Sequence, residues 1–427
     1  MPLADAARRG VRSDGARRGS CSCRRTSMNI LVAHNFYKLA GGEDQCVAAE
    51  VALLRAHGHE VTQYCLSNDS IDDMGRLQLA SRTIWSRQTI AEMRQLIRSH
   101  RPQVVHFHNT FPLMSPAAYY AAHAEGVPVV QTLHNFRLVC VNALLFRDGK
   151  PCEDCLGKAT LWRGVAHNCY RHSTAASATV ATMLGAHRML GTWRHAVDAY
   201  VALSAFSRRK FVEGGLPAEK IVVKPNFLFP EPRVGVGDGG YAVYVGRLSE
   251  EKGIQALLKA WQGLEVPLKI VGDGPLDGLV REAAARNAAI DWLRGVAHED
   301  VYELIGGAAA LILPSQCYEG ALPRVVIEAF AKGTPVIVPR HGAMADIVDG
   351  HNGVCFASGD ADDLAACVRS LWSEASVLTE MRRAARETFD QYFTAEANYH
   401  ALMAVYARAI DQYAGHDLSE IEAGSAA

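Results

Sequence analysis

An α/β fold with two domains, each built on a parallel sheet, is predicted by three features of the sequence. The chain has 427 residues, and a single hydrophobic core stops growing beyond about 250–300 residues. Short apolar segments typical of strands alternate with helical segments, as in parallel sheets joined by crossover helices. Residues 226–240 are rich in proline and glycine and break both periods, which indicates a linker between domains.

The expected elements follow this alternation from one end of the chain to the other. The segment Met28-Asn-Ile-Leu-Val-Ala33 opens the first strand at once. The strands expected before the linker span 29–34, 60–64, 103–107, 128–132, 199–203 and 220–224. The helices expected there span 43–57, 88–100 and 174–196. The strands expected after the linker span 241–245, 267–271, 290–293, 309–313 and 335–338.

The first 27 residues differ in composition from the rest. They hold seven arginines and two aspartates and almost no apolar residues, so we expect disorder there. An over-long gene model whose true start is Met28 explains this best, and a transit peptide or basic membrane-binding arm is the alternative. The remaining residues carry a net charge of −6, which does not indicate a nucleic-acid partner. We expect a cytoplasmic protein, because neither a signal peptide nor an 18-residue apolar run occurs.

Two strand-loop-helix units after the linker carry the charged residues of a candidate site. Arg247 and Lys252 follow the strand ending at Val245, close to the start of a helix. Positive side chains beside a helix N-terminus suit a diphosphate. Glu319 and Glu328 add two carboxylates on the second unit. Phosphate-binding cations and carboxylates at the strand ends of one sheet predict a site for a nucleotide sugar.

Four motifs in this order resemble a known family. They are Gly-Arg-Leu-Ser-Glu-Glu-Lys-Gly at 246–253, Val-Gly-Asp-Gly-Pro-Leu at 271–276, Pro-Ser-Gln-Cys-Tyr-Glu-Gly at 314–320 and Glu-Ala-Phe-Ala-Lys-Gly-Thr-Pro-Val-Ile at 328–337. Together they resemble the retaining glycosyltransferases of the GT-B type, family 4, also called glycosyl transferases group 1. The resemblance covers residues 28 to about 409.

This resemblance implies two Rossmann-like domains that face each other across a cleft. Residues 28–228 would form the acceptor-side domain and 229–394 the domain that binds the nucleotide-sugar donor. Residues 395–415 would form a helix that crosses back to the first domain. The implied reaction moves a sugar from a nucleoside diphosphate to an acceptor hydroxyl with retention at the anomeric carbon, and it requires no cofactor.

The resemblance also assigns roles to residues of the second domain. Arg247 and Lys252 would neutralise the diphosphate, Glu328 would bind the ribose hydroxyls, and Glu319 would lie near the donor sugar. Between the two glutamates, Gly320, Ala321 and Leu322 would also contact the donor. The sequence departs from the family here, because Glu319 and Glu328 are nine positions apart instead of eight. A wider turn in 320–323 would absorb the extra residue, and displacement of Glu319 is the alternative.

In the first domain, the resemblance points to paired glycines and a histidine. Gly41 and Gly42 follow the first strand and would let the backbone approach the donor. His134 ends a strand, and its family counterpart contacts the donor sugar. His106 and His108 alternate along another strand and therefore share a face, where they flank the acceptor or pack structurally.

Four cysteines of the first domain have the spacing of a structural zinc site. Cys140, Cys152, Cys155 and Cys169 form C-x11-C-x2-C-x13-C. Disulfides are disfavoured in the cytosol, which leaves zinc coordination and reduced, packed thiols as the two alternatives.

The predicted partners are a nucleoside diphosphate sugar and a glycan or lipid-linked acceptor, as in surface polysaccharide synthesis. The apolar stretch 179–193 would either contact a membrane face or, as the default, pack on the sheet. Two other functions remain open: a sugar-nucleotide epimerase or phosphorylase of the same architecture, and a non-catalytic subunit that binds nucleotide sugars.

Overall fold

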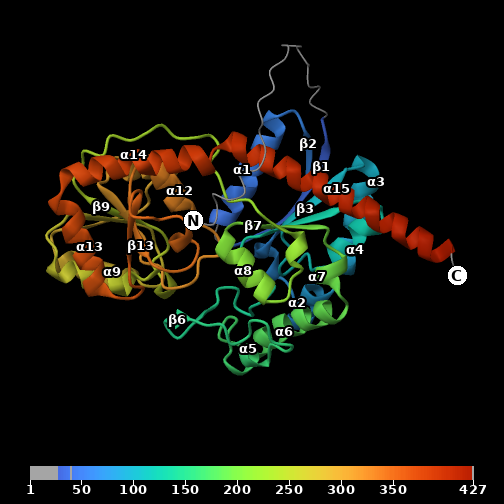
Figure 1. Ribbon diagram of the computed structural model, residues 1–427. Helices are drawn as coiled ribbons and strands as arrows, with labels where there is room; N and C mark the ends of the chain where they lie inside the picture. Colours follow the sequence, from blue (N-terminus) through green and yellow to red (C-terminus); the bar gives the residue numbers. More distant parts are fainter. Residues whose placement is uncertain (1–26, 39–40, 426–427) are drawn as a thin grey trace, which may run out of the picture.

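Two six-stranded parallel sheets, one in each half of the chain, form the framework of the protein (Figure 1). The computed structural model describes residues 27–38 and 41–425, and side chains up to Gly415 except that of His298. The prediction of disorder for residues 1–27 therefore lies outside the described residues, apart from Ser27.

The first sheet has the strand order β2-β1-β3-β4-β7-β8. Its strands are β1 (Asn29–Phe36), β2 (Glu60–Ser67), β3 (Val104–Asn109), β4 (Val129–Leu133), β7 (Ala199–Ala202) and β8 (Ile221–Val223). All six were expected from the apolar pattern, and their pairing is parallel throughout. Residues 146–147 and 150–151 add the short antiparallel hairpin β5 (Phe146–Arg147) and β6 (Lys150–Pro151).

Helices pack on both faces of this sheet. They are α1 (Gly42–Ala56), α2 (Arg76–Ile84), α3 (Arg87–His100), α4 (Ala117–His123), α5 (Trp162–Ala166), α6 (Thr174–Met189), α7 (Thr192–His195) and α8 (Ala205–Glu213). The helical region predicted over 174–196 is confirmed, but it is not one continuous helix. Gly191, with φ of 68°, breaks it into α6 and α7, because a left-handed residue cannot continue an α-helix.

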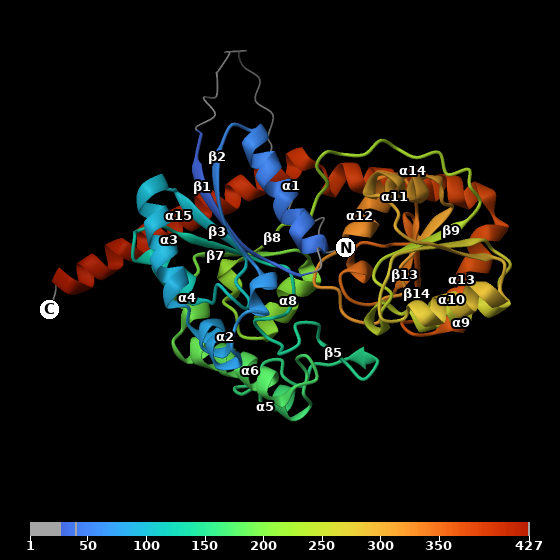
Figure 2. The same cartoon turned by 180° about the vertical axis from the view of Figure 1, so that it is seen from behind.

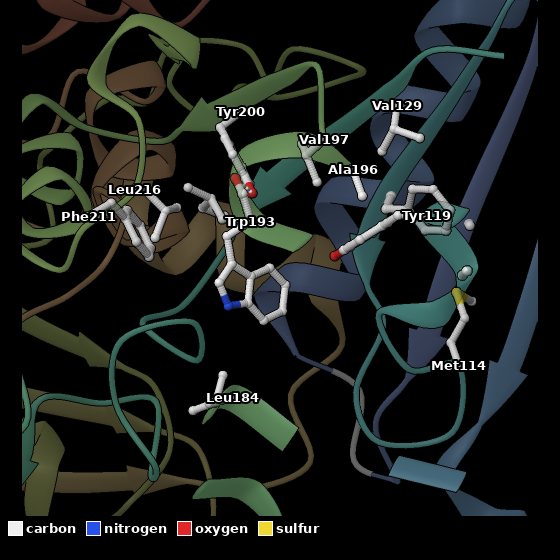
Figure 3. Close-up of a cluster of buried hydrophobic side chains, with 14 of the residues drawn as sticks. Met114, Tyr119, Val129, Leu184, Trp193, Ala196, Val197, Tyr200, Phe211 and Leu216 are labelled. Carbon is white, nitrogen blue, oxygen red and sulfur yellow. Dashed lines mark hydrogen bonds between the residues drawn. The ribbon is translucent and has the colours of Figure 1, made fainter. Parts of the chain in front are cut away.

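The break at Gly191 lets the chain bury Trp193 in the core of the first domain. Figure 3 shows its indole between Tyr200 of β7 and Leu184 of α6, and its backbone oxygen accepts a 2.8 Å hydrogen bond from the Tyr200 hydroxyl. The apolar side chains of α6, including Val180, Met183 and Leu184, are buried against this core. The default prediction for the stretch 179–193 is therefore confirmed for these side chains. Among the helices that the structure describes, none combines the length and apolar character needed to cross a membrane.

The second sheet has the strand order β11-β10-β9-β12-β13-β14. Successive strands are added on one side of β9 up to β11 and on its other side from β12 onward. Its strands are β9 (Ala242–Val245), β10 (Leu268–Val271), β11 (Ile290–Leu293), β12 (Ala310–Ile312), β13 (Val336–Pro339) and β14 (Gly353–Phe356). Its helices are α9 (Ile254–Ala260), α10 (Asp277–Arg286), α11 (His298–Gly307), α12 (Arg324–Ala331), α13 (Ala361–Ser373) and α14 (Ala375–Tyr392). The sequence pattern missed β14, a half-buried edge strand of four residues.

The last helix, α15 (Ala395–Ser425), returns to the first domain and lies along it in both views (Figures 1 and 2). Its residues Leu402, Val405 and Tyr406 are buried against strands of the first sheet. The Tyr406 hydroxyl lies 2.9 Å from Nδ1 of His106 on β3. The chain therefore passes between the domains twice, once through residues 226–240 and once just before α15.

Candidate active site

A cleft of about 420 Å³ lies between the carboxyl ends of the strands of the two sheets. This is where open parallel sheets bind ligands. The first domain and the linker line it with Gly42, Glu43, Gln45, His134, Leu203 and Asn226. The second domain lines it with Val245, Gly246, Lys252, Val301, Leu313, the run Glu319–Val325 and Glu328.

Lys252 and Glu319 form an ion pair on the second domain's wall of this cleft. The Lys252 ammonium lies 2.6 Å from Oε1 of Glu319, which also accepts a 2.7 Å hydrogen bond from Ser315 Oγ. Burial alone would lower the pKa of Lys252, but the adjacent carboxylate outweighs it and raises that pKa, so the ammonium is charged. The sequence-predicted cation and one predicted carboxylate thus meet at the strand ends.

The glycine after Lys252 allows the backbone to approach the neighbouring strand end. Gly253 has φ of 74°, and a Cβ at this position would lie 1.9 Å from the Pro314 carbonyl oxygen. Any side chain would force the loop that carries Lys252 away from the loop that carries Ser315 and Glu319. The last glycine of the Glu-Lys-Gly motif is therefore explained by packing between the two loops.

The segment with the extra residue lies where the two domains meet. Gly320 is packed so that a Cβ would be 3.3 Å from the His134 carbonyl oxygen, and its own oxygen accepts a 3.4 Å hydrogen bond from Ser204 Oγ. Ala321 and Leu322 line the cleft, and Pro323 precedes the first turn of α12. The positive end of this helix therefore faces the same space as Lys252.

Glu328 lies one turn into α12 and is only 4% exposed. Its Oε1 accepts a 2.9 Å hydrogen bond from Nε of Arg324, one turn earlier on the helix. Nη1 of Arg324 is buried with no hydrogen-bond partner in the described part of the chain. The sequence analysis did not single out Arg324, although its place four residues before Glu328 is a recognisable signal.

Two predicted site residues do not line the cleft. The Arg247 side chain is exposed at its edge, and its backbone oxygen accepts a 2.8 Å hydrogen bond from the Tyr244 hydroxyl. Gly41 instead precedes the first turn of α1, where its N–H donates to Oδ2 of Asp44 at 2.9 Å. Of the paired glycines, only Gly42 lines the cleft, and its Cβ position would lie 4.0 Å from Cβ of Arg324 across the domain boundary.

Glu43, which follows the paired glycines, was missed by the sequence analysis. Its Oε2 accepts hydrogen bonds from the Tyr37 hydroxyl at 3.0 Å and from Asn135 Nδ2 at 3.4 Å. Its Oε1 is buried with no partner among the described residues. Burial raises the pKa of Glu43 to about 8, so the group is mostly protonated at pH 7. A cleft-lining carboxyl with a strongly shifted pKa is a candidate functional group.

His134 reaches the cleft at the end of a buried chain of polar groups. Its Nε2 lies 2.9 Å from Nδ1 of His108, and Nε2 of His108 lies 3.2 Å from the Glu50 carboxylate. Burial lowers the pKa of His108 to about 4 and that of His134 well below its usual range, so both are neutral. Nε2 of His108 and Oε1 of Glu50 are both buried with no hydrogen-bond partner among the described residues, so the contact between them does not have hydrogen-bond geometry.

Glu50, His106 and His108 bring three ligand atoms within 4.8 Å of one another, a distance that would suit a metal ion. The Lys224 ammonium, however, lies 3.1 Å from Oε2 of Glu50. Burial would raise the pKa of Glu50, but Lys224 outweighs this and holds the pKa well below its usual range. A second cation beside Lys224 is disfavoured, so we interpret the group as a buried ion pair packed against two imidazoles. His106 and His108 are therefore packed residues behind the cleft wall.

The four cysteines predicted as zinc ligands lie together, outside the cleft. Cys140, Cys152, Cys155 and Cys169 line one cavity of about 20 Å³ in the first domain. None of them forms a disulfide.

Two family models match consecutive parts of the chain. The one described as Glycosyltransferase Family 4 matches residues 40–231, and the one described as Glycosyl transferases group 1 matches residues 233–388. The boundary between the two matches falls in the linker.

Curated relatives share about a quarter of the aligned residues. Glycogen synthase of Mycobacterium tuberculosis is 27% identical over 314 residues, which are 69% of this chain and 66% of the relative. The putative teichuronic acid biosynthesis glycosyltransferase TuaC of Bacillus subtilis is 26% identical over 304 residues, 70% of this chain and 69% of the relative. The chain thus spans about two thirds of the length of these relatives.

Among solved structures, Anabaena HepE in complex with UDP superposes with a TM-score of 0.63 at 18% identity. The match covers 89% of this chain and all of HepE. At this identity the likeness supports the fold.

Proposed function

Because the chain belongs to the glycosyl transferases group 1 family and has the GT-B fold, we propose that it is a retaining glycosyltransferase. It would transfer a sugar from a nucleoside diphosphate to an acceptor hydroxyl. The observation that carries the proposal is the wall of the cleft on which Lys252, the first turn of α12 and buried Glu328 face one space.

In this proposal the diphosphate lies beside Lys252 and the first turn of α12. A cation and backbone N–H groups stabilise the negative charge that develops on a departing phosphate, so the proposed mechanism includes no divalent metal ion. Glu328 would accept hydrogen bonds from the ribose hydroxyls. Arg247, exposed at the edge of the cleft, would contribute to the diphosphate site by its positive charge.

The sugar would extend from the diphosphate toward His134, Glu319 and Gly320. The acceptor hydroxyl would attack the anomeric carbon from the face that the diphosphate leaves. A new carbon–oxygen bond forms, the bond to the phosphate oxygen breaks, and the acceptor proton passes to the leaving phosphate. This route needs no covalent intermediate on a side chain.

The proposed donor and acceptor classes draw on the relatives. HepE has been crystallised with UDP and with UDP-glucose, which supports a nucleoside diphosphate sugar as donor. The names of the two curated relatives refer to glycogen and to teichuronic acid biosynthesis, which supports a growing glycan as acceptor. A cytoplasmic location, at the inner face of a membrane when the acceptor is lipid-linked, belongs to the same proposal.

A two-stage experiment tests this function. Thermal shift with UDP, GDP and ADP and their common sugar conjugates identifies the donor, which should raise the melting temperature. Release of nucleoside diphosphate is then measured with glycan acceptors, and NMR of the product should show the anomeric configuration of the donor. Binding without turnover on any acceptor would favour the non-catalytic subunit, and an altered sugar nucleotide without transfer would favour an epimerase.

A further inference from the structure

The segment between the end of β4 and the start of α6 has little regular structure for its length. Residues 134–173 contain only the two-residue strands β5 and β6 and the five-residue helix α5. Connections this long without secondary structure of their own are uncommon in compact domains, so something else must hold such a segment in place.

The backbone of this segment is also strained. Eight non-glycine residues in the described part of the chain have positive φ, and six of them lie between 143 and 172. They are Ala143, Leu145, Asp148, Asn168, Arg171 and His172, with φ between 47° and 69°. Left-handed conformations of such residues cost free energy and persist only where surrounding structure imposes them.

The turns of this segment bring four cysteines to one place. Cys152 follows the β5–β6 hairpin, and its N–H donates to the Leu145 oxygen at 2.8 Å. Cys169 follows α5, and its N–H donates to the Gly164 oxygen at 3.0 Å. Together with Cys140 and Cys155, they surround the cavity of about 20 Å³.

We propose that the thiolates of Cys140, Cys152, Cys155 and Cys169 bind one zinc ion, which holds the segment 134–173 in its fold. Four cysteine sulfurs, including a C-x2-C pair, are a typical donor set for structural zinc. All four coordination positions are filled by protein, so the site is closed and takes no part in catalysis.

The sulfurs must move closer together to bind the ion. Zinc–sulfur bonds of about 2.3 Å place tetrahedral sulfurs about 3.8 Å apart. Among the described residues, no three of these sulfurs lie within 4.8 Å of one another. At present Cys140 Sγ donates a 2.9 Å hydrogen bond to Oδ1 of Asn142, and this bond would be given up on deprotonation. Zinc binding therefore requires the four side chains to rotate toward the cavity that they line.

A cation in the cavity wall would offset the negative charge of a four-thiolate zinc site. Arg147 lines the cavity, with Nη1 at 3.1 Å from Oδ2 of Asp154. The Glu50 cluster differs, because its one carboxylate is already neutralised by the Lys224 ammonium.

The segment reaches the second domain, so its order matters beyond its own turns. The β5–β6 hairpin points toward the second domain in both views (Figures 1 and 2). A Cβ on Gly149 in this hairpin would lie 3.5 Å from Oε1 of Glu250. Glu153, beside Cys152, forms a 2.9 Å ion pair with Lys210 on α8. The zinc ion would thus fix a contact near the cleft without entering it.

Metal analysis of the purified full chain tests the proposal independently of any activity. About one equivalent of zinc is expected, with X-ray absorption showing four sulfur neighbours at about 2.3 Å. Cys155→Ser should lose at least four fifths of the bound zinc and lower the melting temperature. The matched control Cys65→Ser, at an exposed cysteine of the same domain, should keep both.

Thiol counting decides the case even if Cys155→Ser fails to fold. In native parent protein the four thiols should be protected from an aromatic disulfide reagent, and chelation should expose them while lowering the melting temperature. Parent protein without zinc, whose four thiols react or pair as disulfides with an unchanged melting temperature, would overturn the proposal.

Discussion

The two walls of the cleft differ in where their charged groups lie. On the second-domain wall, Lys252 and Glu319 line the cleft and form an ion pair with a distance of 2.6 Å. On the opposite wall the charges lie behind the surface, in the buried pair of Glu50 and Lys224. The cleft-lining groups of that wall, Glu43 and His134, are mostly neutral at pH 7, because burial shifts the pKa of each away from its charged form.

This difference indicates which end of a ligand faces which wall. A diphosphate is stabilised by the cleft-lining cation Lys252 and the α12 N-terminus, whereas sugar hydroxyls need neutral donors and acceptors. The proposed nucleotide sugar has both ends. Substitutions in the second-domain wall should therefore change turnover and nucleotide binding, whereas substitutions in the first-domain wall should change stability and its dependence on pH.

The largest effect is expected from Glu50→Gln, which removes the charge behind the first wall. Lys224 would remain buried without its carboxylate, and breaking a buried pair in this way costs about 3–5 kcal/mol. Urea unfolding at pH 7 measures the loss. Glu60→Gln, at an exposed position on β2, is the control and should change little. Equal stability of Glu50→Gln and parent would show that the pair does not support the wall.

On the second wall, Lys252→Ala should lower turnover by on the order of 100-fold, since it removes a cation placed for the leaving phosphate. Steady-state kinetics with the donor found by thermal shift provide the measurement. Lys259→Ala, an exposed lysine on the adjacent helix α9, is the matched control. If both variants keep parental turnover, Lys252 does not act on the diphosphate.

A smaller loss, about tenfold or 1.4 kcal/mol, is expected in nucleoside diphosphate binding for Glu328→Gln. A carboxylate accepts hydrogen bonds from two hydroxyls more strongly than an amide does. Titration calorimetry gives the dissociation constant, and Glu303→Gln, whose parent side chain is 80% exposed, serves as the control. Unchanged affinity in Glu328→Gln would contradict the ribose-binding role.

A last prediction sharpens the comparison through pH. The Glu43 carboxyl has an ordinary pKa of 4.5 and a pKa of about 8 in the folded chain, so the folded state binds its proton more tightly. Stability contributed by this group therefore falls as pH rises from 4.5 to 8. Glu43→Gln has no carboxyl to ionise and lacks this loss. The difference between its melting temperature and that of the parent should therefore increase from pH 4.5 to 8 and stay constant above pH 8. Parallel melting curves from pH 5 to 8 would refute the raised pKa.

The sequence predicted the second wall better than the first because its residues lie close together in the chain. Lys252 and Gly253 occur in one motif, and Glu319 and Glu328 lie nine positions apart in the loop and helix that follow another strand. Parallel strands place such positions at one edge of the sheet without any knowledge of side-chain packing. Arg247 also occupies its expected position in the motif, but its side chain is exposed. A motif predicts where a residue lies along the chain and does not determine which way its side chain points.

The first wall depends on contacts that no local pattern encodes. Glu50 and Lys224 are 174 positions apart and meet only when α1 packs near the end of β8. The raised pKa of Glu43 depends on burial beside Tyr37 and Asn135, which come from two other loops. The strands were predictable from apolar runs, whereas the break at Gly191 and the edge strand β14 depended on tertiary context.

The return of α15 to the first domain has a consequence for the order in which the chain folds during synthesis. Lys224 bonds to Asn398 Oδ1 at 2.9 Å, and His59 lies 2.8 Å from the Tyr399 hydroxyl, so the first domain needs residues that are made after those of the second domain. The second domain is complete in sequence before α15 emerges from the ribosome. A nascent chain should therefore finish the second domain before the first, the reverse of the order in which most of their residues are made.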